Sequence, residues 1–147
     1  MGFREAVTVC IQDYHRFSGR ARRSEYWWFI LFVLAGNVLL SLIDAVIFGD
    51  EMLLGLSGLF AMLTFLPQIA VLWRRLHDTG RPGWFNFLPS IPLVALFSGV
   101  LRSGSSIDSA VVLVLLCLSI LLMIAVLVFL ALPSQAGPNR FGPEPPP

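Results

Sequence analysis

Long apolar runs separated by short polar segments make up most of this chain. The runs cover residues Trp27–Phe48, Met52–Trp73, Trp84–Leu101 and Ser109–Leu132. Each is close to the roughly 20 residues that an α-helix needs to cross about 30 Å of hydrocarbon. The pattern therefore predicts four transmembrane helices between residues 27 and 132. The first run begins too late and is too long for a secretory signal peptide, so we expect the N-terminal segment to stay attached.

The connections between the runs carry further predictions. Asp50 and Glu51 leave almost no loop between the first two runs, which predicts an antiparallel helical hairpin. The third run contains Pro89 and Pro92, and each proline removes a backbone donor and favours a kink. We expect this run to cross the membrane as a bent helix. The alternative is a re-entrant segment, which would send the C-terminus to the outer side.

The two ends of the chain differ from the apolar runs. Within residues 3–17 the apolar side chains recur at spacings of three and four, which predicts a short interfacial amphipathic helix. Trp27 and Trp28 then stand where aromatic belts mark the headgroup level. From Pro133 onward, proline and glycine predict an extended or disordered tail. The predicted fold class is all-α: an integral membrane four-helix bundle preceded by the amphipathic helix.

The positions of the charged residues predict an orientation. All ten basic residues are arginines, and nine of them lie on one side of the four-helix topology, with Arg102 on the other. Basic residues near helix ends stay on the cytoplasmic side of a membrane. We therefore expect segment 1–26 and tail 133–147 both to be cytoplasmic.

Composition excludes a soluble monomer. The chain is 56% hydrophobic and 13% charged with a mean hydropathy of +0.80, whereas soluble domains average about 45–50% apolar and about 25% charged residues. The net charge of +1 gives no argument for a nucleic-acid partner. The two cysteines and two histidines form no spaced zinc motif. We therefore expect no disulfide, no metal and no other cofactor.

Six arginines on the predicted cytoplasmic side form a candidate contact surface for phosphate-bearing groups. They are Arg20, Arg22, Arg23, Arg74, Arg75 and Arg81, with Glu25, His77 and Asp78 as orienting residues. The bidentate guanidinium suits phosphate oxygens, and a basic residue near an anionic leaflet contributes on the order of 1 kcal/mol. We expect a non-enzymatic membrane protein that acts through anionic lipid headgroups, another membrane protein or a second copy of itself. The alternative is a structural corner in which the arginines complement a helix dipole and pair with Glu25 and Asp78.

Polar side chains inside the predicted spans suggest a different function. With small residues they form stripes at helical spacing, Asn37, Ser41 and Asp44 in the first run and Ser57, the small Ala61, Thr64 and Gln68 in the second. The stripes favour helix-to-helix packing. An oligomeric transporter or channel component, with the first stripe lining its path, is the alternative. Asp44 lies near the outer end of its helix, where we expect it to reach headgroup water or Arg102.

Two reactive side chains suggest chemistry at the membrane surface. His77 and Asp78 are adjacent, which is a hypothesis for a phosphate-chemistry enzyme. Consecutive helical residues do not face each other, however, and the other histidine is His15. We therefore expect no catalytic residues. Acylation of Cys10 is an alternative to a buried structural thiol.

Three separated stretches carry a family resemblance. They are residues 17–27 (FSGRARRSEYW), 74–84 (RRLHDTGRPGW) and 137–145 (GPNRFGPEP). In this order the chain resembles the bacterial membrane-protein family called domain of unknown function 805, with Phe141 and Pro82 as small departures. The resemblance implies a small integral protein of the bacterial cytoplasmic membrane. It implies no established reaction and no catalytic residues.

Overall fold

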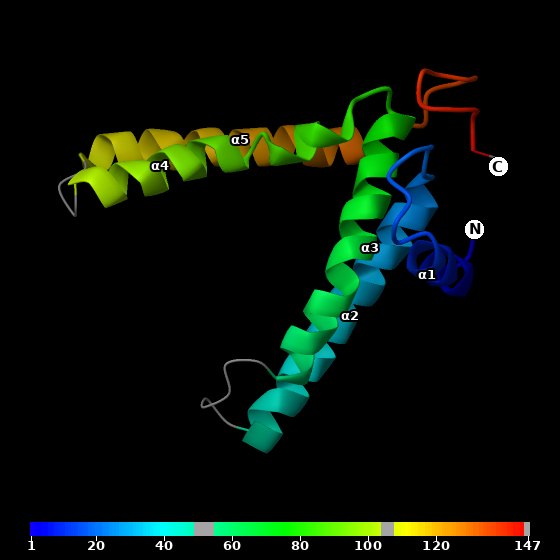
Figure 1. The fold of residues 1–147 in the computed structure, drawn as a ribbon, viewed down its shortest axis with the longest axis horizontal. Helices are drawn as coiled ribbons and strands as arrows, with labels where there is room; N and C mark the ends of the chain where they lie inside the picture. The colour runs from blue at the N-terminus through cyan, green and yellow to red at the C-terminus, as the bar shows by residue number, and fades with distance from the viewer. Residues whose placement is uncertain (49–54, 104–107, 146–147) are drawn as a thin grey trace.

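The computed structural model describes residues 1–48, 55–103 and 108–145, and this part of the chain is helical (Figure 1). Its α-helices are α1 (Phe3–Gln12), α2 (Arg23–Phe48), α3 (Leu56–Asp78), α4 (Ser90–Ser103) and α5 (Ser109–Ala131), with a 3₁₀ turn, η2, at Gly83–Phe87. The predicted all-α class is confirmed. The predicted amphipathic helix over residues 3–17 ends earlier, at Gln12, and the chain then turns, with the Arg16 amide donating to the Asp13 carbonyl.

The apolar helices form two hairpins instead of one bundle. α2 packs along α3, and α4 packs along α5. The hairpins meet where the C-terminal end of α3 contacts α5, and they diverge from there (Figure 1). The expectation of a single four-helix bundle is therefore wrong. The connection at residues 49–54, which includes Asp50 and Glu51, lies outside the described residues, but the hairpin predicted around it is present.

Three of the described helices are long and apolar enough to span a membrane. They lie within Arg23–Ile47, Leu56–Asp78 and Ser109–Ala131. The third apolar run differs from its prediction because it divides into η2 and the 14-residue α4, which rises only about 21 Å at 1.5 Å per residue. Pro89 precedes α4 and Pro92 lies in its first turn. A first-turn amide needs no helical partner, so Pro92 is accommodated without a kink.

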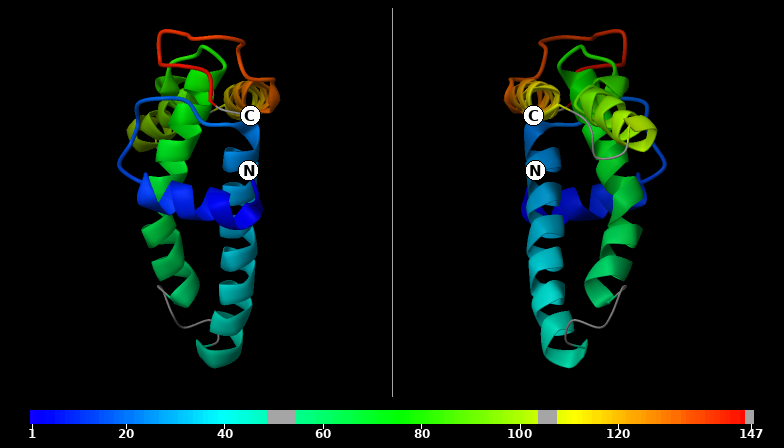
Figure 2. Two further views of the ribbon diagram at one scale, coloured as in Figure 1. Left: turned by 90° about the vertical axis from the view of Figure 1, so that its right-hand side faces the viewer. Right: turned by 90° about the vertical axis from the view of Figure 1, so that its left-hand side faces the viewer.

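Helix α1 lies across α2 and α3, between the two ends of this hairpin (Figure 2). Its buried side is anchored by Ala6 and Cys10. Phe3, at its start, packs edge-on against Trp28 with ring centroids 5.8 Å apart. The side chain of Ile11 remains exposed. Helix α1 is therefore held at the level of the tryptophans that were expected to mark the headgroup region.

Most polar groups on the α2–α3 hairpin are satisfied within their own helix. The Asn37 amide donates to the Val33 carbonyl at 3.0 Å, and the Thr64 hydroxyl donates to the Phe60 carbonyl at 2.8 Å. Gln68 donates to the Thr64 hydroxyl at 3.3 Å. The side chain of Ser41 is exposed. These bonds satisfy Asn37, Thr64 and Gln68 locally. The expected bonding between the two stripes is present at one pair, where the Ser57 hydroxyl donates to Asp44.

Asp44 joins the two helices at the opposite end of the hairpin. Its carboxylate accepts from the backbone amides of Leu56 and Ser57, each at 2.8 Å, and from the Ser57 hydroxyl at 2.6 Å. A Cβ on Gly55 would lie 2.3 Å from this carboxylate, so the close approach requires glycine. Asp44 thus caps the N-terminus of α3, where amides lack helical partners. The expectation that Asp44 would reach Arg102 is replaced by this cap.

We predict that Asp44→Ala lowers the thermal unfolding temperature of the protein in detergent micelles, measured by circular dichroism. The start of α3 would lose the acceptor for two amides and a hydroxyl. Asp44→Asn keeps one carbonyl oxygen and should lose less. Ser98→Ala, which removes an exposed hydroxyl bonded to its own helix, is the control. An Asp44→Ala protein that unfolds at the wild-type temperature would contradict the capping role.

Candidate functional site

Three segments that are far apart in the sequence meet at the end of the molecule that carries both termini. They are residues 18–26, the end of α3 with its following turn (74–81), and the tail from Pro133 (Figure 1). The Gln135 amide donates to the Asp78 carbonyl at 3.0 Å, and Asn139 and Gly142 form an antiparallel bridge. The tail is therefore ordered over the described residues, which corrects the expectation that it is extended or disordered.

Arg20, Arg75 and Asp78 form the centre of this assembly, which we call the clamp. Arg20 Nε lies 2.9 Å from Asp78 Oδ1, and Arg75 Nη1 pairs with Asp78 Oδ2. The Arg20 and Asp78 side chains are 1% and 0% exposed, and Arg75 is fully buried. One carboxylate thus compensates two buried guanidinium groups. This is the pairing of arginines with Asp78 that the structural-corner alternative expects.

The remaining donors of the two clamp arginines bind backbone carbonyls. Arg75 donates through Nε to the Leu130 carbonyl at 3.0 Å and through Nη2 to the Leu132 carbonyl. These carbonyls belong to the last turn of α5 and the residue after it, where helical partners are lacking. Arg20 donates to the carbonyls of Gly137, at 2.6 Å, and Gln135. The clamp therefore joins the start of α2, the end of α3, the end of α5 and the tail.

The turn after α3 is held by aromatic contacts. The His77 ring stacks on Phe141 with centroids 3.9 Å apart, and its Nδ1 lies 3.2 Å from the Gly19 carbonyl oxygen. The Arg81 guanidinium lies 3.7 Å from the centre of the Phe129 ring. Gly80 takes a φ of +76°, which glycine adopts without steric cost. The chain turns at Gly80, and these side chains fix the tail and α5 to the turn.

Arg74 is part of a second buried group, between α1, α2 and α3. Its Nη1 lies 2.9 Å from Glu25 Oε1 and 3.7 Å from Asp13 Oδ2. The Cys10 thiol lies 4.0 Å from the same Glu25 oxygen. Burial, with a smaller contribution from the Glu25 charge, raises the pKa of Cys10 to about 12. A buried and protonated thiol is a poor nucleophile, so the structure favours a structural Cys10 over acylation.

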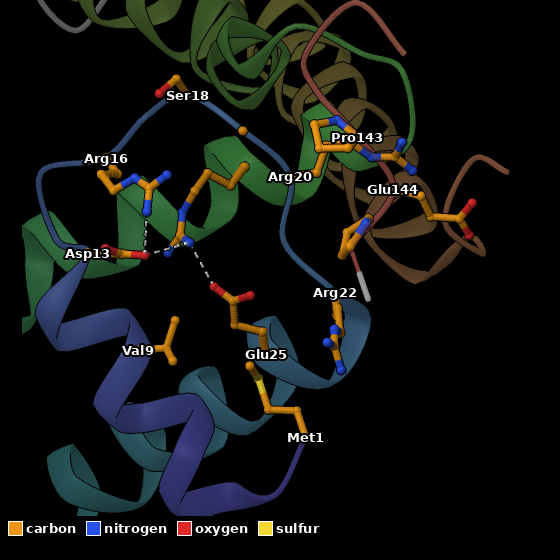
Figure 3. Close-up of a pocket in the computed structure, with 13 residues that line it drawn as sticks. Met1, Val9, Asp13, Arg16, Ser18, Arg20, Arg22, Glu25, Pro143 and Glu144 are labelled. Atoms are coloured by element: carbon orange, nitrogen blue, oxygen red, sulfur yellow. Dashed lines mark hydrogen bonds and ion pairs between the residues drawn. The ribbon is translucent and has the colours of Figure 1, made fainter. Parts of the chain in front are cut away.

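A pocket of about 360 Å³ opens beside Arg74 (Figure 3). Its wall is built from α1, the 16–20 segment, the start of α2 and the end of the tail. The lining side chains that matter for its chemistry are Arg16, Arg20, Arg22, Arg74, Asp13, Glu25 and Glu144. Arg22 is half-buried there, whereas Arg23 is exposed at the first residue of α2. The six predicted arginines are thus at one end of the molecule, but they have different surroundings.

Sequence reasoning missed the tail residues and Asp13. The backbone of Gln135 and Gly137 accepts from Arg20, and the Asn139 side chain donates to the His77 carbonyl at 3.0 Å. The sequence held one signal for an ordered tail, because residues 137–145 carry part of the family resemblance. An ordered role explains such a stretch better than a free tail does. Among the described residues, no group of three or more His, Cys, Asp or Glu side chains could hold a metal ion.

We predict that Asp78→Asn destabilises the protein by about 3–5 kcal/mol, the usual cost of breaking a buried ion pair by removing one partner. The change keeps the shape of the side chain but leaves Arg20 and Arg75 without their counter-charge. Equilibrium unfolding in micelles measures the loss, and limited proteolysis reports release of the tail. Arg16→Gln, whose partner contact is exposed, should cost no more than about 1 kcal/mol. Equal stability of the two variants would refute the central role of Asp78.

Comparison with known proteins places the chain in a family. It is 32% identical over 139 residues to the inner membrane protein YhaH of Escherichia coli K12, covering 92% of this chain and 91% of the relative. It is also 32% identical over 135 residues to the inner membrane protein YhaI of the same strain, covering 92% and 90%. No solved structure matches the chain.

The family match covers the clamp, Arg74 and the three long apolar helices. Residues 14–143 match the family described as "Protein of unknown function (DUF805)". Together with the three long apolar helices, these relationships identify a multi-pass inner-membrane protein. The chain belongs to the DUF805 family.

Proposed function

We propose that this protein acts without catalysing a reaction, through contacts of its arginine-rich cytoplasmic face with anionic lipid headgroups and with other membrane proteins. The observation that carries this proposal is the position of α1. The helix lies across the α2–α3 hairpin with Phe3 and Ile11 exposed, and Phe3 packs at the level of the exposed Trp28. Apolar and aromatic side chains at such a level are typical of a surface in contact with the headgroup region.

The arginines divide into two groups on this surface. Arg20 and Arg75 donate to protein acceptors inside the clamp, and Arg81 lies on Phe129. Their role is to hold the face together. Arg4 and Arg23 are exposed, so they remain available to phosphate oxygens outside the protein. Of the six arginines that the sequence indicated, Arg23 is exposed for such contacts, whereas Arg22 and Arg74 line the pocket. Arg4 was not among the six and joins Arg23 on the exposed surface.

The clamp supports placement of both termini on one side of the membrane, and the excess of arginines there favours the cytoplasmic side. The tail binds Arg20 and the end of α3, so residues 18–26, 74–81 and 133–142 occupy one side of the membrane. The chain must then cross an even number of times between Asp78 and Pro133. α5 is long enough for one crossing, so the η2–α4 segment supplies the other. This favours four crossings over the re-entrant alternative, which would separate the tail from Arg20.

The contacts of the other candidate residues favour this proposal over its alternatives. The Asp78 oxygens are held by two arginines, and His77 is packed between Phe141 and Gly19, so an acid–base role would require breaking the clamp. Asp44 caps α3. A transport path would require the same carboxylate to leave the amides that it caps.

We predict that reporters joined to either end of the full chain report a cytoplasmic location: green fluorescent protein fluoresces and alkaline phosphatase is inactive. Alkaline phosphatase inserted after Ser103 should be active, because four crossings place the α4–α5 connection outside the cytoplasm. An inactive enzyme there, with both termini cytoplasmic, would show that η2–α4 does not cross. Active phosphatase at the C-terminus would contradict the shared side of the termini.

We predict that replacing Arg4 and Arg23 together by glutamine lowers the retention of dioleoyl phosphatidylglycerol about 30-fold, since each basic residue contributes on the order of 1 kcal/mol near anionic lipid and about 1.4 kcal/mol is a factor of ten. Native mass spectrometry of the gently purified protein measures the bound lipid. Arg102→Gln, an exposed arginine at the end of α4, is the matched control and should change nothing. Unchanged retention in the double variant would count against the lipid-contact proposal.

A further inference from the structure

Arg74 is buried at the wall of the cytoplasmic pocket with two hydrogen-bond donors unused. Its side chain is 6% exposed, and Nη1 is held by Glu25 and Asp13. Nε and Nη2, both shielded from water, have no hydrogen-bond partner. The neighbouring Cys10 thiol is a weak acceptor at best. Each buried donor without an acceptor costs about 1–3 kcal/mol. Because less than 1 Å² of each nitrogen is exposed, an acceptor reaches this edge of Arg74 only when the surrounding side chains move aside.

The two unused donors define the geometry of that acceptor. Nε–H and Nη2–H lie on the same edge of the planar guanidinium, and their bonds run side by side. Such a fork matches two oxygens of one carboxylate or phosphate group. The opposite edge carries the ion pair with Glu25, which fixes the direction in which the fork points.

The pocket has the size and charge of a site for a small anion. Its volume of about 360 Å³ lies at the lower end of the roughly 300–1,000 Å³ of small-molecule sites. Four arginines and three carboxylates line it, so the formal charge of these groups is +1. Asp13 and Glu25 are already paired with arginines, and Glu144 accepts from the Gly137 amide at 2.6 Å. Figure 3 shows Arg16, Arg20 and Arg22 arranged around the pocket.

We propose that this pocket binds the phosphodiester of a membrane phospholipid headgroup, with the Nε–Nη2 edge of Arg74 on its oxygens. This deepens the proposed function and rests on it. A phosphodiester carries one negative charge, which matches the lining, whereas a phosphate monoester carries about 1.5 to 2 at neutral pH. The lipid source follows from depth, because α1 forms one wall through Val9 and lies at the level of the exposed tryptophans.

The test measures the dissociation constant of dioleoyl phosphatidylglycerol for the full chain in micelles by native mass spectrometry titration. Arg74→Lys keeps the positive charge beside Glu25 but removes the fork, and should weaken binding at least about tenfold. Val9→Phe fills the pocket without changing a charge and should weaken binding as well. Circular dichroism checks that each variant folds. If Arg74→Lys does not fold, Val9→Phe still tests whether the pocket binds the lipid. Arg102→Gln is the control.

A competition arm separates the two sources of phosphate. Excess inorganic phosphate, compared with chloride at matched ionic strength, should leave lipid binding unchanged. Equal competition by inorganic phosphate would overturn the lipid assignment, because the site would then take a free anion. Unchanged affinity in both Arg74→Lys and Val9→Phe would overturn the assignment of the pocket as the lipid site. A trapped water would then be the acceptor for Nε and Nη2 of Arg74.

The pocket inference and the proposed function can fail separately, because different variants test them. The Arg4 and Arg23 double variant lies outside the pocket lining. If that variant loses lipid while Arg74→Lys does not, the surface contact stands and the pocket inference fails. If Arg74→Lys loses lipid while the double variant does not, the pocket stands and the exposed surface is dispensable.

Discussion

The buried carboxylate of Asp78, held between the guanidinium groups of Arg20 and Arg75, fixes which parts of the chain meet. Taking these charges out of water is costly, and the cost is offset only when every remaining donor finds an acceptor. The carbonyls that complete the network come from the end of α5 and from the tail. The ion pairs therefore determine the tertiary arrangement as well as the local turn. Lysine, with a single point charge, could not make these fork-shaped contacts.

Much of the helical structure was predictable because it depends on local pattern. The apolar lengths of the first, second and fourth runs gave α2, α3 and α5, and the spacing of Phe3 and Cys10 gave α1. The roles of the arginines were not predictable to the same extent. Arg20 and Asp78 are 58 residues apart, and Arg20 and Gly137 are 117 apart. A charge count places such residues on one side of a membrane but does not say which of them pair.

The packing of the hairpins could not be predicted from the hydrophobic pattern either. α5 is apolar around its whole circumference, so its sequence indicates no side that must face a neighbouring helix. In lipid, burial of apolar surface between helices gains little, because the acyl chains are equally apolar. Polar contacts then decide where helices meet. They lie at the clamp, at the Arg74–Glu25 pair and at the Asp44 cap. The clamp ties the α2–α3 hairpin to the α4–α5 hairpin at one end, and the two hairpins diverge beyond it.

The same tail that completes the clamp also closes the pocket. Arg20 holds the backbone of Gln135 and Gly137, and a few residues later Pro143 and Glu144 form part of the pocket wall. The shape of the wall therefore depends on the clamp, although Arg74 itself makes its ion pairs with α1 and α2. Loss of the Asp78 charge should open the pocket without removing its arginine fork. The stability of the clamp and the affinity of the pocket for the proposed headgroup are thus coupled through one short stretch of tail. The coupling runs in both directions, because a headgroup that bridges Arg74 and the tail wall would stabilise the clamp in return.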